Sequence, residues 1–425
     1  MTQSPVPIPL NPFRPGAGVQ PLYLAGRTKE HEEFARLLDQ VPVIQNLIIT
    51  GLRGVGKTVL LQDLKPLAQV RQWLWASNEI SESASLSEGR IAQRLVIDLS
   101  TLLGPIIVQR QEVLPFGFNS KAQIKNTPLT YHDLWKVYEE TPGFPSDKLK
   151  AVLTLTAKLL EATTIKGIVF AYDEAQNLSD HAEKEEYPLA LLLDVFSYMQ
   201  RQNFKTAFLL VLTGLPTLIP KLNEARTYTE RMFHTLMLER LPDTDAREAI
   251  VKPIEISKSS LQFSEQVITE AIRSSGGYPF FIQYICKEVF DAWIGKIQVG
   301  QAPSVPKAEI IAKLDQDFFA PRWSRATDRQ QAFMQVIATL ESGEGEFTVP
   351  EIVKASKEIL HNGFSPSHAV QILGNLTEKG FVYRNRRGAY CFAVPLLAQF
   401  IRRQNWDPEA IKLPLSSASG PELPL

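Results

Sequence analysis

A glycine-rich segment that ends in lysine and threonine is the clearest chemical signature in this sequence. Residues 51–58 read GLRGVGKT, which satisfies the phosphate-loop pattern GxxxxGK[ST] in full. Glycines permit positive φ and close backbone approach, so amide groups can surround phosphate oxygens. Lys57 can then reach the β- and γ-phosphates, and the Thr58 hydroxyl can ligate Mg²⁺. The predicted nucleotide-binding residues are Gly51, Arg53, Gly54, Val55, Gly56, Lys57, Thr58 and Val59.

Two adjacent carboxylates follow a second apolar run. Residues 167–174 read GIVFAYDE, a strand-like run that ends in Asp173 and Glu174. Carboxylates at the carboxyl end of a strand lie at the edge where open α/β sheets bind ligands. We expect Asp173 to hold Mg²⁺, mostly through water, and Glu174 to act as general base on the attacking water. The second carboxylate favours a nucleotide hydrolase over a nucleotide kinase, which would not need it.

Two further polar residues are candidate catalytic groups. Thr213 ends another apolar run, where it would sense the γ-phosphate or orient the water; a threonine that only starts a turn has the same pattern. Arg231 precedes the next predicted strand, and its guanidinium would be exposed. It is a candidate arginine finger for the nucleotide of a neighbouring subunit, or a surface residue paired with a nearby glutamate. Arg226 is a weaker candidate for the same role.

The elements that must position these residues alternate between short apolar runs and longer amphipathic stretches. This alternation predicts an α/β fold with a parallel sheet that is covered on both faces by helices. Residues 104–145 hold several Pro and Gly residues and predict an irregular insertion around one short helix near 131–139. The predicted strands are 46–50, 71–76, 167–172, 207–213 and 234–238, and the helices before residue 165 are 29–39, 58–68, 86–103 and 146–163.

The pattern changes twice after Leu241. Helices alone are predicted first, at 244–251, 264–274, 279–294 and 307–319. Then follow three helices (329–340, 349–359 and 367–379), two short strands (381–383 and 390–393) around a basic turn, and a helix that ends at 403. The order of three helices and a hairpin predicts a winged helix.

The chain therefore divides into five predicted segments. Proline and glycine dominate the first twenty residues, which indicates an extended arm and not a packed element. The segments are a proline-rich arm (1–22), a P-loop ATPase core (23–242), a helical lid (243–325), a winged-helix domain (326–404) and a flexible tail (405–425).

Composition excludes several classes of protein. The 425 residues include 45 basic and 46 acidic side chains, for a formal net charge of −1. This balance excludes a polybasic whole-chain binder of nucleic acid, although a local basic patch is compatible with it. Two cysteines, Cys286 and Cys391, are too few for a disulfide scaffold and lack zinc-site spacing. No run reaches the ~18 apolar residues of a membrane span and no secretory signal is evident, so we expect a cytoplasmic protein without a membrane partner.

The predicted winged helix is locally basic. Residues 351–403 contain eight Lys or Arg residues and three Glu residues, so DNA phosphates are one candidate partner. The predicted recognition helix, 367–379, is itself not strongly basic, and its His368, Gln371 and Asn375 could read bases or only face solvent. Two roles stay open for this module: DNA binding, or a regulatory contact within the chain or with a protein partner.

Taken in order, these motifs resemble the additional-strand P-loop ATPases. Within them the chain is similar to the border group between AAA+ and STAND ATPases, bacterial and archaeal proteins related to origin-recognition proteins. The resemblance covers about residues 20–400. It rests on residues 24–27 (LAGR) with the acidic helix that follows, the phosphate loop, Asp173–Glu174, Thr213, Arg231 and the triplet Gly277–Tyr278–Pro279.

The resemblance implies further roles. Ala25, Gly26 and Arg27 would line the adenine pocket, Thr213 would be sensor 1, and Pro279 would contact the base as in the GxP motif of STAND proteins. The chain departs from AAA+ proteins at one point, because the lid helix has no arginine in its first two turns. The sensor-2 arginine is therefore missing there, which favours a slow nucleotide switch over a processive ring-type motor.

Three functions follow from the sequence. The first is an ATP-binding and ATP-hydrolysing molecular switch that uses Mg²⁺, cycles between ATP and ADP, and regulates a protein partner or its own oligomerisation. The second is a DNA-binding ATPase of the origin-recognition or transposition-regulator type. The third is a scaffold that binds nucleotide without turnover.

Overall fold

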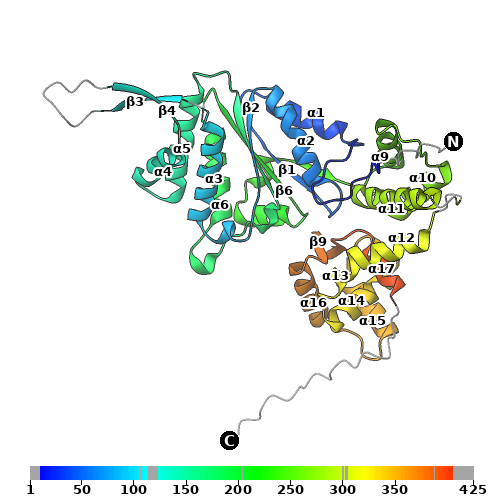
Figure 1. Ribbon diagram of the computed structural model, residues 1–425. Coiled ribbons are helices and arrows are strands. Elements are labelled where there is room, and N and C mark those ends of the chain that lie inside the picture. Colours follow the sequence, from blue (N-terminus) through cyan, green and yellow to red (C-terminus); the bar gives the residue numbers. More distant parts are fainter. Residues whose placement is uncertain are drawn as a thin grey trace, which may run out of the picture.

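A five-stranded parallel sheet organises the first half of the molecule (Figure 1). The computed structural model describes residues 10–105, 107–112, 123–202, 204–298, 301, 305–386 and 388–404. The strand order is β2-β5-β6-β1-β7, and every neighbouring pair is parallel. The strands are β1 (Asn46–Gly51), β2 (Trp73–Glu79), β5 (Gly167–Asp173), β6 (Ala207–Gly214) and β7 (Phe233–Leu238). The predicted α/β class is confirmed, and β6 is the additional strand between β1 and β5.

Helices cover both faces of the sheet, because alternate strand residues point to opposite sides and both sets are apolar. On one face Phe170 and Leu210 pack against α3 (Glu88–Leu103), α5 (Pro145–Leu160) and α6 (Pro188–Gln200). On the other face Val169 and Leu209 pack against α1 (Thr28–Leu38) and α2 (Lys57–Val70). The remaining helices of this half are α4 (Tyr131–Glu140), α7 (Leu218–Ala225) and α8 (Thr229–Met232).

The segment between α3 and α4 differs from the prediction. The short helix α4 is where the sequence placed it, but the residues before it form an antiparallel hairpin of β3 (Ile107–Glu112) and β4 (Gln123–Pro128). Among the described strands, these two pair only with each other, and they project from the body of the molecule (Figure 1). Since they do not join the sheet, their sequence lacks the apolar alternation that identifies a strand.

A helical unit follows the sheet. It contains α9 (Asp243–Ile256), α10 (Glu265–Ser275), α11 (Pro279–Gln298) and α12 (Lys307–Leu314). The last predicted helix, 307–319, is regular only as far as Leu314. A π-helical turn (Asp315–Phe319) and the short α13 (Ala320–Trp323) follow it directly.

The N-terminal segment packs against this helical unit. Phe13 is 3% exposed; its ring stacks on Phe263 and packs edge-on against Phe290, with centroids 5.8 and 6.3 Å apart. The expectation of an unpacked arm is therefore wrong for residues 10–22. Proline and glycine prevent regular structure there, but they leave Phe13 able to fill a hole between the helices. Residues 1–9 of the predicted arm, like the predicted tail 405–425, lie outside the described residues.

The C-terminal part has the element order of a winged helix. Its three-stranded antiparallel sheet has the order β8-β10-β9. The elements are α14 (Asp328–Thr339), β8 (Phe347–Thr348), α15 (Val349–Ile359), α16 (Pro366–Glu378), β9 (Val382–Arg386), β10 (Ala389–Phe392) and α17 (Leu397–Arg403). Phe281 of α11 and Phe319 of the π-helical turn share its apolar core, so the helical unit and the C-terminal part are packed together. Arg387, in the predicted basic turn, is outside the described residues.

Across the described part of the chain, no helix is long and apolar enough to span a membrane.

Candidate functional site

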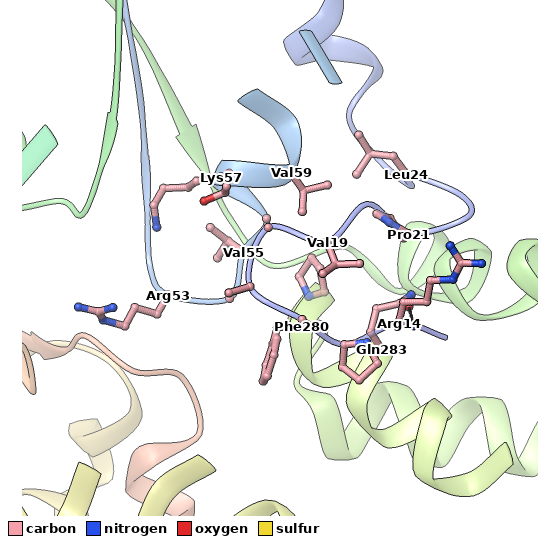
Figure 2. Close-up of a pocket in the computed structure, with 18 of the residues that line it drawn as sticks. Arg14, Val19, Pro21, Leu24, Arg53, Val55, Lys57, Val59, Phe280 and Gln283 are labelled. Atoms are coloured by element: carbon pink, nitrogen blue, oxygen red, sulfur yellow. Dashed lines mark hydrogen bonds between the residues drawn. The ribbon is translucent and has the colours of Figure 1, made fainter. Parts of the chain in front are cut away.

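The phosphate loop joins β1 to α2 and forms one wall of a cavity of about 410 Å³ (Figure 2). Gly54 and Gly56 have φ of +80° and +93°, a region that favours glycine, and they carry the backbone around the turn. The Lys57 ammonium donates hydrogen bonds of 2.9 Å to the carbonyl oxygens of Gly51 and Leu52. All predicted residues from Arg53 to Val59 line the cavity, whereas Gly51 does not.

The surroundings of Lys57 disfavour its charge. The side chain is 9% exposed, and this burial lowers the pKa of Lys57 to about 8, with a smaller lowering from Arg53 and an opposing effect of Glu174 and Asp173. A phosphate anion at the loop would supply the missing negative charge and raise the pKa again. The site is therefore electrostatically suited to an anionic ligand.

Thr58 and Asp173, the predicted metal ligands, lie in direct contact. The Thr58 hydroxyl donates a 2.6 Å hydrogen bond to Asp173 Oδ2, although the two residues are far apart in sequence. Burial raises the pKa of Asp173, against the lowering effect of the Thr58 hydrogen bond, so a cation beside it would stabilise the charged carboxylate. Two adjacent oxygen donors suit Mg²⁺. Within the described residues no group of three or more His, Cys, Asp and Glu side chains could hold a metal, so phosphate and water would complete the coordination.

Glu174 lines the cavity beside the phosphate loop. Its backbone is in the left-handed region, with φ of +50°, which costs roughly 1–2 kcal/mol for a residue with a side chain. Gln176 holds the carboxylate, because its amide nitrogen donates to Glu174 Oε2. The amide oxygen of Gln176 in turn accepts a 3.0 Å hydrogen bond from the Leu215 backbone at the end of β6. Gln176 thus connects the predicted general base to the strand that carries Thr213.

Thr213 lies on the central strand between the two motifs, but it does not line the cavity. Its side chain is fully buried, and its hydroxyl has no hydrogen-bond partner among the described residues. A buried hydroxyl without a partner is costly, and its position near the end of β6 is that of the predicted sensor. Its role stays a prediction.

Arg27 supports the phosphate loop from behind. It is 6% exposed, and its guanidinium donates to the carbonyl oxygens of Val55 (2.8 Å) and Glu239 (3.2 Å) and pairs with Glu30. Arg27 and Ala25 line the cavity, whereas Gly26 does not. Gly26 has φ of +64°, and a Cβ there would lie 2.5 Å from Asp245 Oδ2, so glycine is required for packing.

The start of α11 contacts the phosphate loop directly. The Phe280 amide donates a 3.1 Å hydrogen bond to the Gly54 carbonyl, and Pro279, Phe280 and Gln283 line the cavity. Figure 2 shows Phe280 below the loop and Val19, Pro21 and Leu24 on its far side.

The N-terminal segment forms this far side of the cavity. Residues 14–19 all line it. Gln20 donates a 2.8 Å hydrogen bond to the Val59 carbonyl, and a Cβ on Gly18 would lie 3.0 Å from Thr58 Cγ2. The sequence did not identify this wall, since a proline-rich segment has no periodicity that reveals where it packs.

The two arginine-finger candidates differ. Arg226 is paired bidentately with Asp194 and is not available as a finger. Arg231 is exposed and does not line the cavity, so it could act only on a neighbouring molecule and stays a prediction. The sequence also missed Arg322, which lines the cavity from α13.

Comparison with known proteins supports the fold. No curated protein matches the chain in sequence, and residues 316–401 match a family described as Domain of unknown function (DUF8462). The Walker-type ATPase paby2304 of Pyrococcus abyssi superimposes with a TM-score of 0.52 at 16% identity, over 89% of this chain and 96% of that chain. The ORC2 protein of Aeropyrum pernix, with ADPNP and ADP, has a TM-score of 0.52 at 12% identity, over 90% and 95%. The chain thus has the fold of the P-loop ATPases related to origin-recognition proteins.

Proposed function

We propose that this protein binds ATP together with Mg²⁺ and hydrolyses it slowly, as a molecular switch. One observation carries the proposal: Lys57, Thr58 and Glu174 line a single cavity, and Asp173 is hydrogen-bonded to Thr58 at its edge. The likeness in fold to a Walker-type ATPase and to a protein seen with ADPNP and ADP supports the choice of nucleotide.

Each residue has a chemical role in this proposal. The amides of the phosphate loop and the start of α2 bind the phosphates, and Lys57 neutralises the β- and γ-oxygens. Thr58 and Asp173 would hold Mg²⁺, which would neutralise charge on the transferred phosphoryl group. Glu174 accepts a proton from the attacking water, while Gln176 fixes the orientation of its carboxylate.

The switch follows from the contact between α11 and the phosphate loop. The Phe280 amide donates a hydrogen bond to the Gly54 carbonyl. A nucleotide that binds the loop would therefore affect the position of the helical unit, and that position would affect nucleotide binding. Partner binding or self-association would then follow the nucleotide state.

Phosphate release tests the proposal. Lys57→Ala should weaken ATP binding at least tenfold, since a charged hydrogen bond contributes about 1.5–3 kcal/mol. Glu174→Gln should bind ATP normally but hydrolyse it about 10²–10⁴-fold more slowly. Equal release rates in the wild type and both variants would exclude hydrolysis at this site. Tight ATP binding without turnover in the wild type would instead identify a nucleotide-binding scaffold.

A further inference from the structure

In the part of the chain that the structure describes, two arginines meet beside the phosphate loop without an acidic partner. Arg53 belongs to the loop, whereas Arg322 comes from α13, more than 260 residues later in the chain. Both line the nucleotide cavity. No carboxylate among the described residues forms an ion pair with either side chain, although nine other arginines have one. Two like charges gathered in a partly buried place are unfavourable unless an anion joins them.

A continuous series of contacts fixes Arg322 in this place. The Phe280 amide is bonded to Gly54 of the loop at 3.1 Å. The Phe280 ring packs on Phe318, with centroids 5.2 Å apart, and the Arg322 guanidinium lies 4.0 Å from the Phe318 ring centroid. Arg322 also donates a 2.8 Å hydrogen bond to the Phe318 carbonyl. This bond uses one nitrogen of the guanidinium and leaves its other donors for a ligand.

The Arg53 side chain extends from the phosphate loop toward the C-terminal part. Figure 2 shows its side chain extending away from the loop. A Cβ placed on Gly380, in the turn between α16 and β9, would lie 3.7 Å from Arg53 Nη2. Burial lowers the pKa of Arg322, and the charge of Arg53 and, less strongly, that of the exposed Arg325 lower it further. The two side chains therefore belong to one electrostatic unit that spans the ATPase core and the winged helix.

We propose that Arg322 and Arg53 together bind the γ-phosphate end of ATP, so that the C-terminal winged helix responds to the difference between ATP and ADP. This inference rests on the proposed ATP binding. The helical lid supplies no arginine from the first two turns of α11, and Arg322 would provide that positive charge from the next segment of the chain.

Binding measurements on the full chain test the assignment. Wild type, Arg322→Gln and the control Arg325→Gln are titrated calorimetrically with a non-hydrolysable ATP analogue and with ADP, in Mg²⁺. Arg325 is exposed, lies three residues further along and does not line the cavity. Arg322→Gln should lower the affinity for the ATP analogue about 10–100-fold, as expected for a lost charged hydrogen bond. Its affinity for ADP should fall less than about threefold. Arg325→Gln should bind both like wild type.

A second readout follows the winged helix itself. Trp323 is the neighbour of Arg322 and packs edge-on against Phe400 of α17, with centroids 6.0 Å apart. The ATP analogue should change tryptophan emission in the wild type, and this change should be lost in both Trp323→Phe and Arg322→Gln.

The outcomes separate this inference from the proposed function. If the wild type binds neither nucleotide, ATP binding itself is excluded. If the wild type binds the ATP analogue and Arg322→Gln binds it equally well, only the role of Arg322 is overturned. Equal losses for the ATP analogue and for ADP would exclude the γ-phosphate as its ligand. If the ATP analogue changes tryptophan emission in Arg322→Gln as much as in the wild type, the coupling to the winged helix is excluded.

Discussion

Lys57 is the residue whose charge state is most closely tied to ligand binding. Because its pKa is about 8, a part of the protein carries a neutral amine near that pH, and a bound phosphate favours the ammonium form. The affinity for ATP should therefore fall about tenfold between pH 7 and pH 9, and binding at pH 8 should take up about half a proton. Titration calorimetry in two buffers of different ionisation enthalpy measures this uptake.

A matched variant controls the Lys57 prediction. Lys57→Arg keeps a cation that does not deprotonate in this range, so the proton uptake should disappear even if affinity drops. The same uptake in Lys57→Arg would assign the proton to another group.

Gln176 is expected to position Glu174 without touching the nucleotide. Gln176→Ala removes the amide that donates to the Glu174 carboxylate and accepts from Leu215. We expect kcat to fall about tenfold, since one charged hydrogen bond is lost, while ATP affinity stays unchanged. The conservative variant Gln176→Glu keeps an acceptor for the Leu215 amide but loses the donor to Glu174, so its kcat should fall as well. A fall in ATP affinity with an unchanged kcat would indicate a merely structural role.

At the level of elements, the sequence was sufficient to predict the structure wherever apolar periodicity and motif chemistry indicated the same element. The five strands of the core sheet and the phosphate loop follow from local patterns, because β1 and β5 are buried along their whole length. The hairpin β3–β4 did not follow, since its strands are polar and pair only with each other. The cavity wall at residues 14–19 and the approach of Arg322 did not follow either, because both depend on contacts between distant segments.

The N-terminal segment gives a prediction at this scale. Phe13→Ala removes the aromatic ring that holds the segment on the helical unit, a loss of about 3 kcal/mol of packing. Hydrogen exchange of residues 11–19 should accelerate by up to about a hundredfold, and ATP affinity should fall. Leu10→Ala is the control, since Leu10 is 88% exposed. Unchanged exchange in Phe13→Ala would mean that Phe13 does not hold the wall in place.

At the level of the whole molecule, the basic charge of the C-terminal part is partly used internally. Arg402 pairs with Glu344, Arg403 pairs with Asp315, and Lys379 donates to Gln330. The exposed face of α16 otherwise carries mostly neutral side chains, so base readout by this helix has few charged donors.

DNA binding is accordingly expected to be weak and independent of sequence. Fluorescence anisotropy with duplex DNA should give a Kd of roughly 10⁻⁴–10⁻⁶ M that weakens steeply with salt. Arg384→Ala, in the described part of the wing, should lower the salt dependence. Nanomolar, sequence-dependent binding would instead support a DNA-binding ATPase.

The order of the strands in the sheet also determines when the protein can fold. The phosphate-loop strand β1 pairs only with β6 and β7, and β7 ends about 190 residues after β1. A ribosome that adds 5–20 residues per second needs on the order of 10–40 s to synthesise that interval. The first of the two partners, β6, begins about 155 residues after β1 ends, so for most of this time the apolar residues of β1 have no strand partner in the nascent chain. The phosphate-loop strand gains its second partner only when β7 is made, and until then it is a natural binding segment for a chaperone.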